Sequence, residues 1–106
     1  EHIVHPWYMV VATKVREEKA KFIPSAVHVD GTARPQFVSR QTNPLFWHII
    51  DEFRQITGVP VIINTSFNIM GEPIINTPED AIRCFYSTGI DVLVLERYIL
   101  TKDVIR

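Results

Sequence analysis

The feature that most constrains the fold is an apolar run, Val59 to Ile63, which ends abruptly in a polar loop. The loop, Asn64 to Pro73, reads NTSFNIMGEP, and four of its first five residues carry hydrogen-bonding side chains. A short apolar run bounded by turn residues is typical of a buried strand. Because ligands in open α/β sheets bind at the carboxyl ends of strands, the pattern predicts a ligand site in this loop. Asn, Thr, Ser and Gly also form ordinary turns, so composition alone leaves a plain turn as the alternative.

Two helices are predicted from their capping residues and apolar spacing. One spans Pro44 to Thr57, where Asn43 precedes the proline and Gly58 closes the last turn. The other spans Pro78 to Thr88 and begins after Thr77, with two carboxylates in its first turn. The apolar side chains expected to face the core are Leu45, Phe46, Ile49, Ile50, Phe53 and Ile56 in the first helix and Ala81, Ile82 and Phe85 in the second.

Strands are predicted wherever β-branched, aromatic and other apolar residues gather in short runs. The charged segment Arg16 to Lys21 is expected to form a loop or a short helical turn. Strands and helices alternate after Pro44, which favours an α/β fold with right-handed crossovers in one domain that spans residues 1–106. The predicted strands are Trp7–Val15, which we expect to be central, Phe37–Arg40, Val59–Ile63, Asp91–Leu95 and Tyr98–Lys102.

Composition excludes several classes of protein. The 106 residues carry a formal net charge of −1 and no basic block, which argues against a nucleic-acid partner. No apolar run approaches the ~20 residues of a membrane span, and we expect a soluble cytoplasmic domain. The single cysteine, Cys84, excludes an internal disulfide and is expected to be a small buried side chain. His2 and His5 have a spacing that would suit a metal, but Pro6 opposes a continuing helix, so we predict no metal site.

Two motifs together carry a resemblance to a known family. NTSFN followed by GEP, and the upstream segment HVDGTARPQ from His28 to Gln36, resemble the C-terminal domain of the O-carbamoyltransferases. That family includes nodulation protein U and the cephem and aminoglycoside antibiotic carbamoyltransferases. The resemblance implies a YrdC-like fold, an open twisted mixed sheet with helices. Threonylcarbamoyl-AMP synthases share this fold, and their Ser-Ala-Asn motif with a following glycine resembles Ser66-Phe67-Asn68 and Gly71.

The same resemblance implies a function for the domain. It would take carbamoyl phosphate and ATP, with Mg²⁺, to a carbamoyl-adenylate. An N-terminal, metal-containing kinase-like domain of the same polypeptide would then transfer the carbamoyl group to a substrate hydroxyl. That domain is not in this sequence, and the family's arginine- and lysine-bearing upstream segments are also missing. We therefore expect the chain to be a fragment of the domain that binds ATP poorly and is inactive by itself.

Adenylation places growing negative charge on phosphoryl oxygens, so the site needs cations and hydrogen-bond donors. Arg34 matches the arginine of the upstream motif and can donate two parallel bonds to phosphate or carbamoyl oxygens. In the loop, Asn64, Ser66 and Asn68 offer neutral donors for the nucleotide. Gly71 allows close approach of the backbone.

Three further residues have two open interpretations. His28 either binds or tunes a phosphate or has a structural role. Asp30 and Glu72 either hold Mg²⁺ or fix Arg34, or are structural.

Two other functions remain as alternatives. The first is hydrolysis, because His28, Asp30 and Ser66 are the residue types of a hydrolase triad, but the sequence has no G-x-S-x-G elbow. For the function that the resemblance implies, the chain lacks the P-loop and GxGxxG patterns, so the expectation of nucleotide binding rests on the resemblance alone. The second alternative is a non-catalytic docking module that shapes the channel between two active sites. An exposed apolar patch around Trp7 and Trp47 would favour it.

Overall fold

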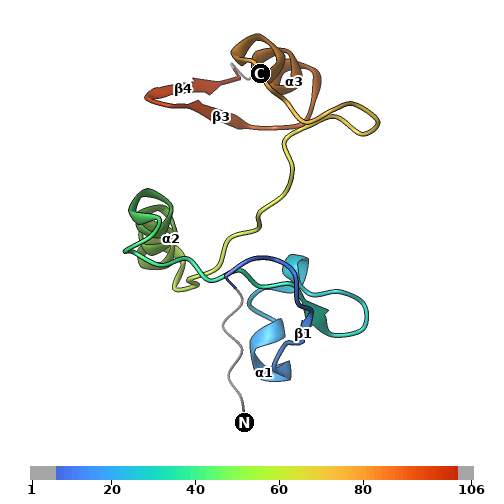
Figure 1. The fold of residues 1–106 in the computed structure, drawn as a ribbon, viewed down its shortest axis with the longest axis vertical. Coiled ribbons are helices and arrows are strands. Elements are labelled where there is room, and N and C mark those ends of the chain that lie inside the picture. The colour runs from blue at the N-terminus through green and yellow to red at the C-terminus, as the bar shows by residue number, and fades with distance from the viewer. Residues whose placement is uncertain (1–6, 103–106) are drawn as a thin grey trace. The chain divides into compact units, whose positions relative to one another are not determined.

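The computed structural model describes residues 7–102, which fall into two compact units, Glu1–Ile63 and Asn64–Arg106. Helices and short antiparallel strand pairs occur together, which confirms the α/β class (Figure 1). The histidine pair His2 and His5 lies outside the described residues. Within residues 7–102, no helix has the length and apolar content needed to cross a membrane.

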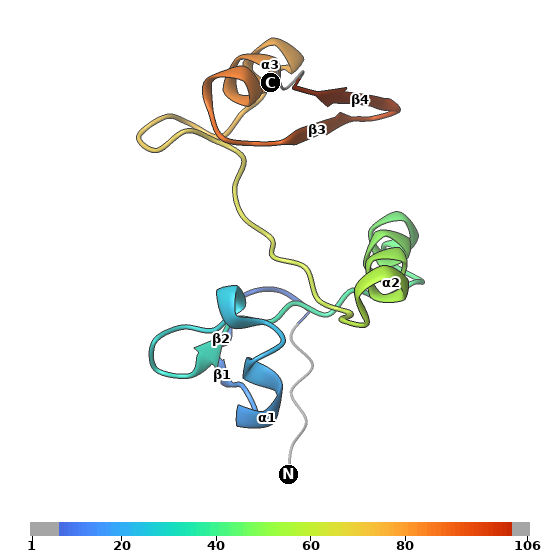
Figure 2. The ribbon, with the colours of Figure 1, turned by 180° about the vertical axis from the view of Figure 1, so that it is seen from behind.

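The first unit contains two short strands, β1 (Thr13–Lys14) and β2 (Thr32–Ala33), which pair in antiparallel orientation (Figure 2). Thr13 lies opposite Ala33, and Lys14 lies opposite Thr32. A helical turn, α1 (Glu17–Ala20), and a 3₁₀ turn, η1 (Pro24–Ala26), connect the two strands. The helical turn confirms the short helix that was one of the two expectations for the charged segment.

The longest element of the first unit is α2 (Pro44–Thr57), which has the predicted bounds. The Asn43 side chain accepts a hydrogen bond of 3.3 Å from the Phe46 amide, which satisfies one of the free donors at the helix start. At the other end Gly58 adopts a left-handed conformation with φ of +78°, which glycine tolerates without a steric penalty. The local signals therefore fix this helix.

The apolar stripe of α2 does not face a core in the described structure. No side chain of the helix is buried, and Leu45 and Ile56 are 73% and 82% exposed. Spacing predicts which residues share a helix face, but only a packed neighbour can bury that face. The prediction of a buried stripe on α2 is therefore wrong for this unit.

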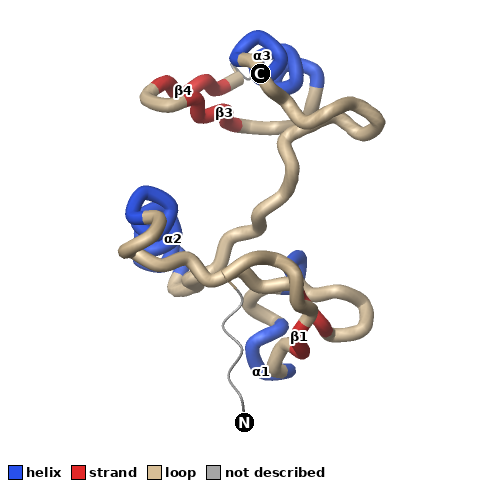
Figure 3. Tube along the Cα trace, in the orientation of Figure 1, coloured by secondary structure: helices blue, strands red, loops and turns tan. Residues whose placement is uncertain are grey.

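Of the three strands predicted within residues 7–63, one is much shorter than expected and two are absent. Only Thr13–Lys14 of the expected first strand is paired, and Phe37–Arg40 is irregular. Residues 59–63 form neither helix nor strand (Figure 3), and Val61 and Ile63 are 38% and 54% exposed. The run was expected to be a buried strand, yet both strand pairs of the described chain are antiparallel and neither includes it. Apolar runs become strands through their neighbours, and β-propensity alone does not supply the partner.

The second unit has a small hydrophobic core. Its helix α3 (Pro78–Ser87) packs with a hairpin of β3 (Val92–Leu95) and β4 (Tyr98–Thr101), in which Leu93 pairs with Leu100. These elements confirm the predicted second helix and the last two strands to within one residue at each end. The core is Ala81, Phe85 and Leu93, with Phe67, Ile75, Ile90, Leu95 and Leu100 packed against it.

Side-chain burial on α3 follows the prediction in part. Ala81 and Phe85 are buried, but Ile82 is 38% exposed. Cys84 is a free, buried thiol, as predicted. Lys102 also contacts the core, because its ammonium donates to the Thr88 carbonyl and lies 4.9 Å from the Phe85 ring centre. Two of the packed residues, Phe67 and Ile75, come from the segment before α3, so the core also anchors the polar loop.

Candidate functional site

The upstream motif forms a tight turn that leads into β2. The Gly31 amide donates to the His28 carbonyl at 2.9 Å, and the His28 amide donates to the Thr32 carbonyl at 2.7 Å. Gly31 takes a φ of +77°, which explains why a glycine follows Asp30 here. The turn places the side chains of residues 28, 30 and 32 close together.

Those three side chains form a continuous hydrogen-bonded chain. The Thr32 hydroxyl donates to Asp30 Oδ1 at 2.7 Å, and the Thr32 amide donates to the same oxygen at 3.0 Å. His28 Nδ1 lies 3.1 Å from the Thr32 hydroxyl oxygen. His28 and Asp30 were predicted as site residues from the sequence. Thr32, whose hydroxyl contacts both of them, was not predicted. An Asp-Gly-Thr turn indicates that the aspartate bonds the threonine amide, but not that the hydroxyl also meets a histidine.

The hydrogen bonds also affect the acidity of Asp30. The Thr32 hydroxyl, and then the Thr32 amide, lower the pKa of the Asp30 carboxyl from its ordinary value of 3.8. Asp30 is therefore a carboxylate at neutral pH, and an acceptor only.

Arg34 follows β2 directly and is exposed. Within residues 7–102, no hydrogen bond or ion pair engages its guanidinium group. An unpaired, exposed arginine can bind an anion without first breaking an internal salt bridge. Gln36, at the end of the motif, lies beside a pocket of about 270 Å³ lined by Trp7, Tyr8, Phe37, Val38, Ser39, Thr42 and Asn43.

The downstream loop is closed by backbone and amide hydrogen bonds. The Glu72 amide donates to the Ile69 carbonyl at 2.9 Å, and Gly71 adopts a φ of +86°. The Asn68 side-chain amide donates to the carbonyls of Ile69 and Glu72 at 3.2 and 3.1 Å. Both Asn68 bonds hold the loop, so the described geometry gives this residue a structural role. Gly71 likewise serves the turn.

Asn64 and Ser66 are exposed, and no hydrogen bond engages the Ser66 hydroxyl in the described part of the chain. Between them and Asn68, Phe67 packs on the core, and its carbonyl accepts from the Ile75 amide at 2.9 Å. The Ser66 hydroxyl is therefore exposed on a loop that the packing of Phe67 holds in place.

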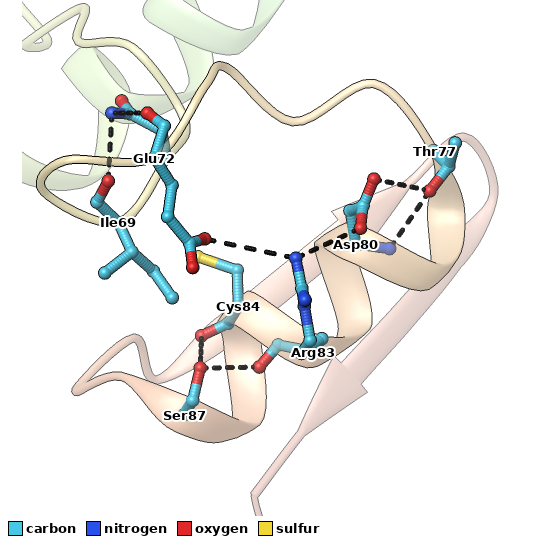
Figure 4. A network of polar contacts seen from close by, with 8 residues as sticks. Ile69, Glu72, Thr77, Asp80, Arg83, Cys84 and Ser87 are labelled. Atoms are coloured by element: carbon cyan, nitrogen blue, oxygen red, sulfur yellow. Dashed lines mark hydrogen bonds and ion pairs between the residues drawn. The ribbon is translucent and has the colours of Figure 1, made fainter.

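Glu72 lies beside a charged group on α3 that the sequence did not indicate (Figure 4). Its Oε2 is 4.0 Å from Arg83 Nη2, and the same nitrogen donates to Asp80 Oδ1 at 3.2 Å. Thr77 caps the helix, because its hydroxyl oxygen accepts from the Asp80 amide and its hydroxyl donates to Asp80 Oδ2. The i, i+3 spacing predicts the Asp80–Arg83 pair, but the Glu72 contact requires the loop to fold back.

The acidic side chains of residues 7–102 do not gather into a cluster that could hold a metal. No group of three or more histidine, cysteine, aspartate or glutamate side chains that could hold a metal gathers in residues 7–102. The Asp30 carboxylate accepts a hydrogen bond from the Thr32 hydroxyl in its own turn, and the Glu72 carboxylate lies 4.0 Å from the Arg83 guanidinium.

The direct histidine–aspartate contact of a hydrolase triad is not formed. His28 Nδ1 meets the Thr32 hydroxyl, which stands between the imidazole and the Asp30 carboxylate. A triad needs the carboxylate to bond the imidazole directly, so that it stabilises the imidazolium that forms.

The described residues therefore hold two polar segments, one in each unit. The first ends at Arg34, whose guanidinium has no partner among residues 7–102, and the second carries Asn64 and Ser66. Comparison with known proteins identifies the family of this chain. Residues 1–102 match the family model described as the carbamoyltransferase C-terminus, so the chain belongs to that family.

Individual relatives agree with the family match. Nodulation protein NolO of Bradyrhizobium diazoefficiens is 43% identical over 95 residues, which is 90% of this chain and 17% of the relative. Nodulation protein U of Rhizobium tropici is 32% identical over 96 residues, which is 91% of this chain and 16% of the relative. The 3'-hydroxymethylcephem-O-carbamoyltransferase of Amycolatopsis lactamdurans is 36% identical over 88 residues, which is 83% of this chain and 16% of the relative. The chain thus spans about one-sixth of the length of these relatives.

Proposed function

We propose that this chain is part of an O-carbamoyltransferase and forms carbamoyl-adenylate from carbamoyl phosphate and ATP. The observation that carries the proposal is that Arg34, in a chain of the carbamoyltransferase C-terminus family, is exposed and has no side-chain partner among residues 7–102. The carbamoyl group would then pass to a substrate hydroxyl in an N-terminal kinase-like domain of the same polypeptide. Use of ATP and carbamoyl phosphate would place the reaction in the cytoplasm.

The chemical step requires stabilisation of phosphoryl charge. Water first cleaves carbamoyl phosphate to carbamate and inorganic phosphate. An oxygen of the carbamate then attacks the α-phosphorus of ATP, a new P–O bond forms, and the bond to the β-phosphate breaks to release pyrophosphate. Negative charge spreads over the phosphoryl oxygens during the step. The Arg34 guanidinium is suited to this charge, because it can donate two parallel bonds and needs no rearrangement of internal ion pairs.

The loop supplies neutral partners for the same reaction. The exposed Ser66 hydroxyl and the Asn64 side chain are the groups we assign to the nucleotide. Asn68 and Gly71 hold the loop shape, and Glu72 lies 4.0 Å from Arg83. The proposal requires the turn of Arg34 and the loop of Ser66 to meet in one cleft of a YrdC-like sheet. Both that meeting and the sheet stay predictions.

A second candidate function is a non-catalytic docking module of the same enzyme. The observation that favours it is exposed apolar surface: Trp7 is 54% exposed, and an apolar groove of about 490 Å³ lies between η1 and the end of α2. Trp47 is half-buried, with the Arg40 guanidinium 5.4 Å from its ring, which weakens the idea of one tryptophan patch. The groove is lined by Phe22, Ile23, Pro24, Ser25, Ala26, Phe53, Thr57, Val59, Val61, Ile62 and Ile63.

Pyrophosphate exchange separates the two candidate functions. The full-length protein is incubated with ATP, carbamoyl phosphate and labelled pyrophosphate, and label is measured in ATP. The adenylation proposal expects exchange that disappears when carbamoyl phosphate is omitted. Failure of the protein to exchange label, while it still transfers carbamoyl groups to an acceptor, would contradict adenylation and favour the docking role for this domain.

A further inference from the structure

The chain of hydrogen bonds from His28 to Asp30 has only one arrangement of protons when Asp30 is ionised. The Thr32 hydroxyl has a single proton, and the 2.7 Å contact assigns it to the Asp30 carboxylate, which can only accept. The hydroxyl oxygen then meets His28 Nδ1 as an acceptor, so Nδ1 must carry a proton. In a neutral imidazole one nitrogen is a donor and the other an acceptor. Nε2 is therefore left with its lone pair.

We propose that Thr32 is a positioning residue that fixes the Nδ1–H tautomer of His28, so that Nε2 presents a hydrogen-bond acceptor to the carbamoyl amide of the substrate. This inference rests on the proposed function for the identity of the substrate. The relay itself rests on the geometry of residues 28–32.

The tautomer decides which part of the substrate His28 recognises. A neutral Nε2 without a proton cannot donate to a phosphate oxygen, which opposes the simpler idea that His28 binds phosphate in its neutral form. Carbamoyl phosphate has one group of donors, its amide N–H bonds, and those match an acceptor. A site built around such a bond discriminates against acyl phosphates that lack the amide. His28 is exposed at the turn, so its ring is accessible to a ligand.

Nitrogen-15 NMR tests the tautomer without depending on activity. The full-length protein is labelled at histidine and measured in the solid state at about pH 8.5, roughly two units above the ordinary histidine pKa. A His28→Gln variant identifies the signals of this residue by difference. We expect Nδ1–H in the parent protein and in Thr32→Ser, and loss of that fixed tautomer in Thr32→Val. An Nε2–H signal in the parent, or an unchanged Nδ1–H signal in Thr32→Val, overturns the proposal.

Kinetics then test the recognition of the amide. Thr32→Val should lower kcat/KM for carbamoyl phosphate in pyrophosphate exchange roughly five- to tenfold, as expected for one weakened hydrogen bond, and Thr32→Ser should restore it. Thr101→Val, on β4, is the matched control, since Thr101 is an exposed threonine far along the sequence from the turn. Equal losses in Thr32→Val and Thr32→Ser would overturn the role of the hydroxyl. If the parent shows no exchange at all, the adenylation proposal fails, and the NMR result still decides the role of Thr32.

Discussion

The two units hold their candidate site residues in different ways. In residues 64–102 a small core of Ala81, Phe85 and Leu93 anchors the polar loop through Phe67. In residues 7–63 no side chain is fully buried, and the turn before Arg34 is held by polar contacts among residues 28–32. One segment therefore depends on apolar packing and the other on local hydrogen bonds. The difference separates mutations that act through stability from those that act through chemistry.

The largest expected effect is on the stability of the second unit. Phe85 is fully buried, and Phe85→Ala should lower the free energy of unfolding by about 3–5 kcal/mol through lost burial and a residual cavity. Urea unfolding followed by circular dichroism measures the loss. Tyr86→Ala is the matched control, because its neighbouring ring is exposed, and it should cost on the order of 0.5 kcal/mol. Similar losses in the two variants would contradict the assignment of the core.

Arg34 should affect chemistry with little effect on stability. Removal of a charge that meets the developing phosphoryl charge should lower kcat by ~10²–10³-fold, or about 2.7–4 kcal/mol. Arg34→Ala should therefore lose most pyrophosphate exchange in the full-length enzyme while its Tm stays near that of the parent. Arg34→Lys should recover little, because an ammonium group cannot donate two parallel bonds in one plane. A clear fall in Tm with unchanged kcat would instead make Arg34 structural.

Asn68 and Ser66 lie two residues apart in the loop and should behave in opposite ways. Asn68→Ala removes two bonds to backbone carbonyls and should lower stability by about 1–2 kcal/mol. Ser66→Ala should leave stability nearly unchanged and lower exchange activity, since its hydroxyl bonds no residue of the described chain. Thermal unfolding and exchange assays on both variants, with Asn76→Ala as an exposed amide control, measure the contrast. A destabilised Ser66→Ala would show that the hydroxyl is structural.

The smallest expected effect is the acid sensitivity of the Asp30 turn. Because the folded pKa of Asp30 is lowered, its stabilising contribution is present above the ordinary value of 3.8 and is lost as pH falls through the folded pKa. Thr32→Val removes the hydroxyl hydrogen bond, which is the largest cause of the lowered pKa, and should raise the pKa of Asp30 toward the ordinary value. A carbon-13 NMR titration of the carboxyl group measures both pKa values. An unchanged pKa in Thr32→Val would contradict the hydroxyl bond.

Sequence reasoning succeeded where the signal is local and failed where it depends on neighbours. The caps at Asn43 and Thr77 bond amides in their own first turns, so both helices follow from nearby residues. The run of residues 59–63 does not form a strand, because apolar content does not specify a partner.

The same distinction applies to the candidate site. His28 and Asp30 were expected on one face, and the structure links them, but through Thr32, whose hydroxyl role has no sequence signature. The contact of Arg83 with Glu72 also depends on the path of the loop, which composition does not specify.

The central claim is that this domain makes carbamoyl-adenylate with Arg34 at the phosphoryl group. The most direct test is a single turnover of the full-length enzyme with ATP and carbamoyl phosphate, without acceptor, quenched and analysed by mass spectrometry. We predict that carbamoyl-adenylate accumulates in the parent and that its rate of formation falls by ~10²–10³-fold in Arg34→Ala. Release of phosphate from carbamoyl phosphate without any adenylate in the parent, or equal rates of adenylate formation in the two proteins, would contradict the claim.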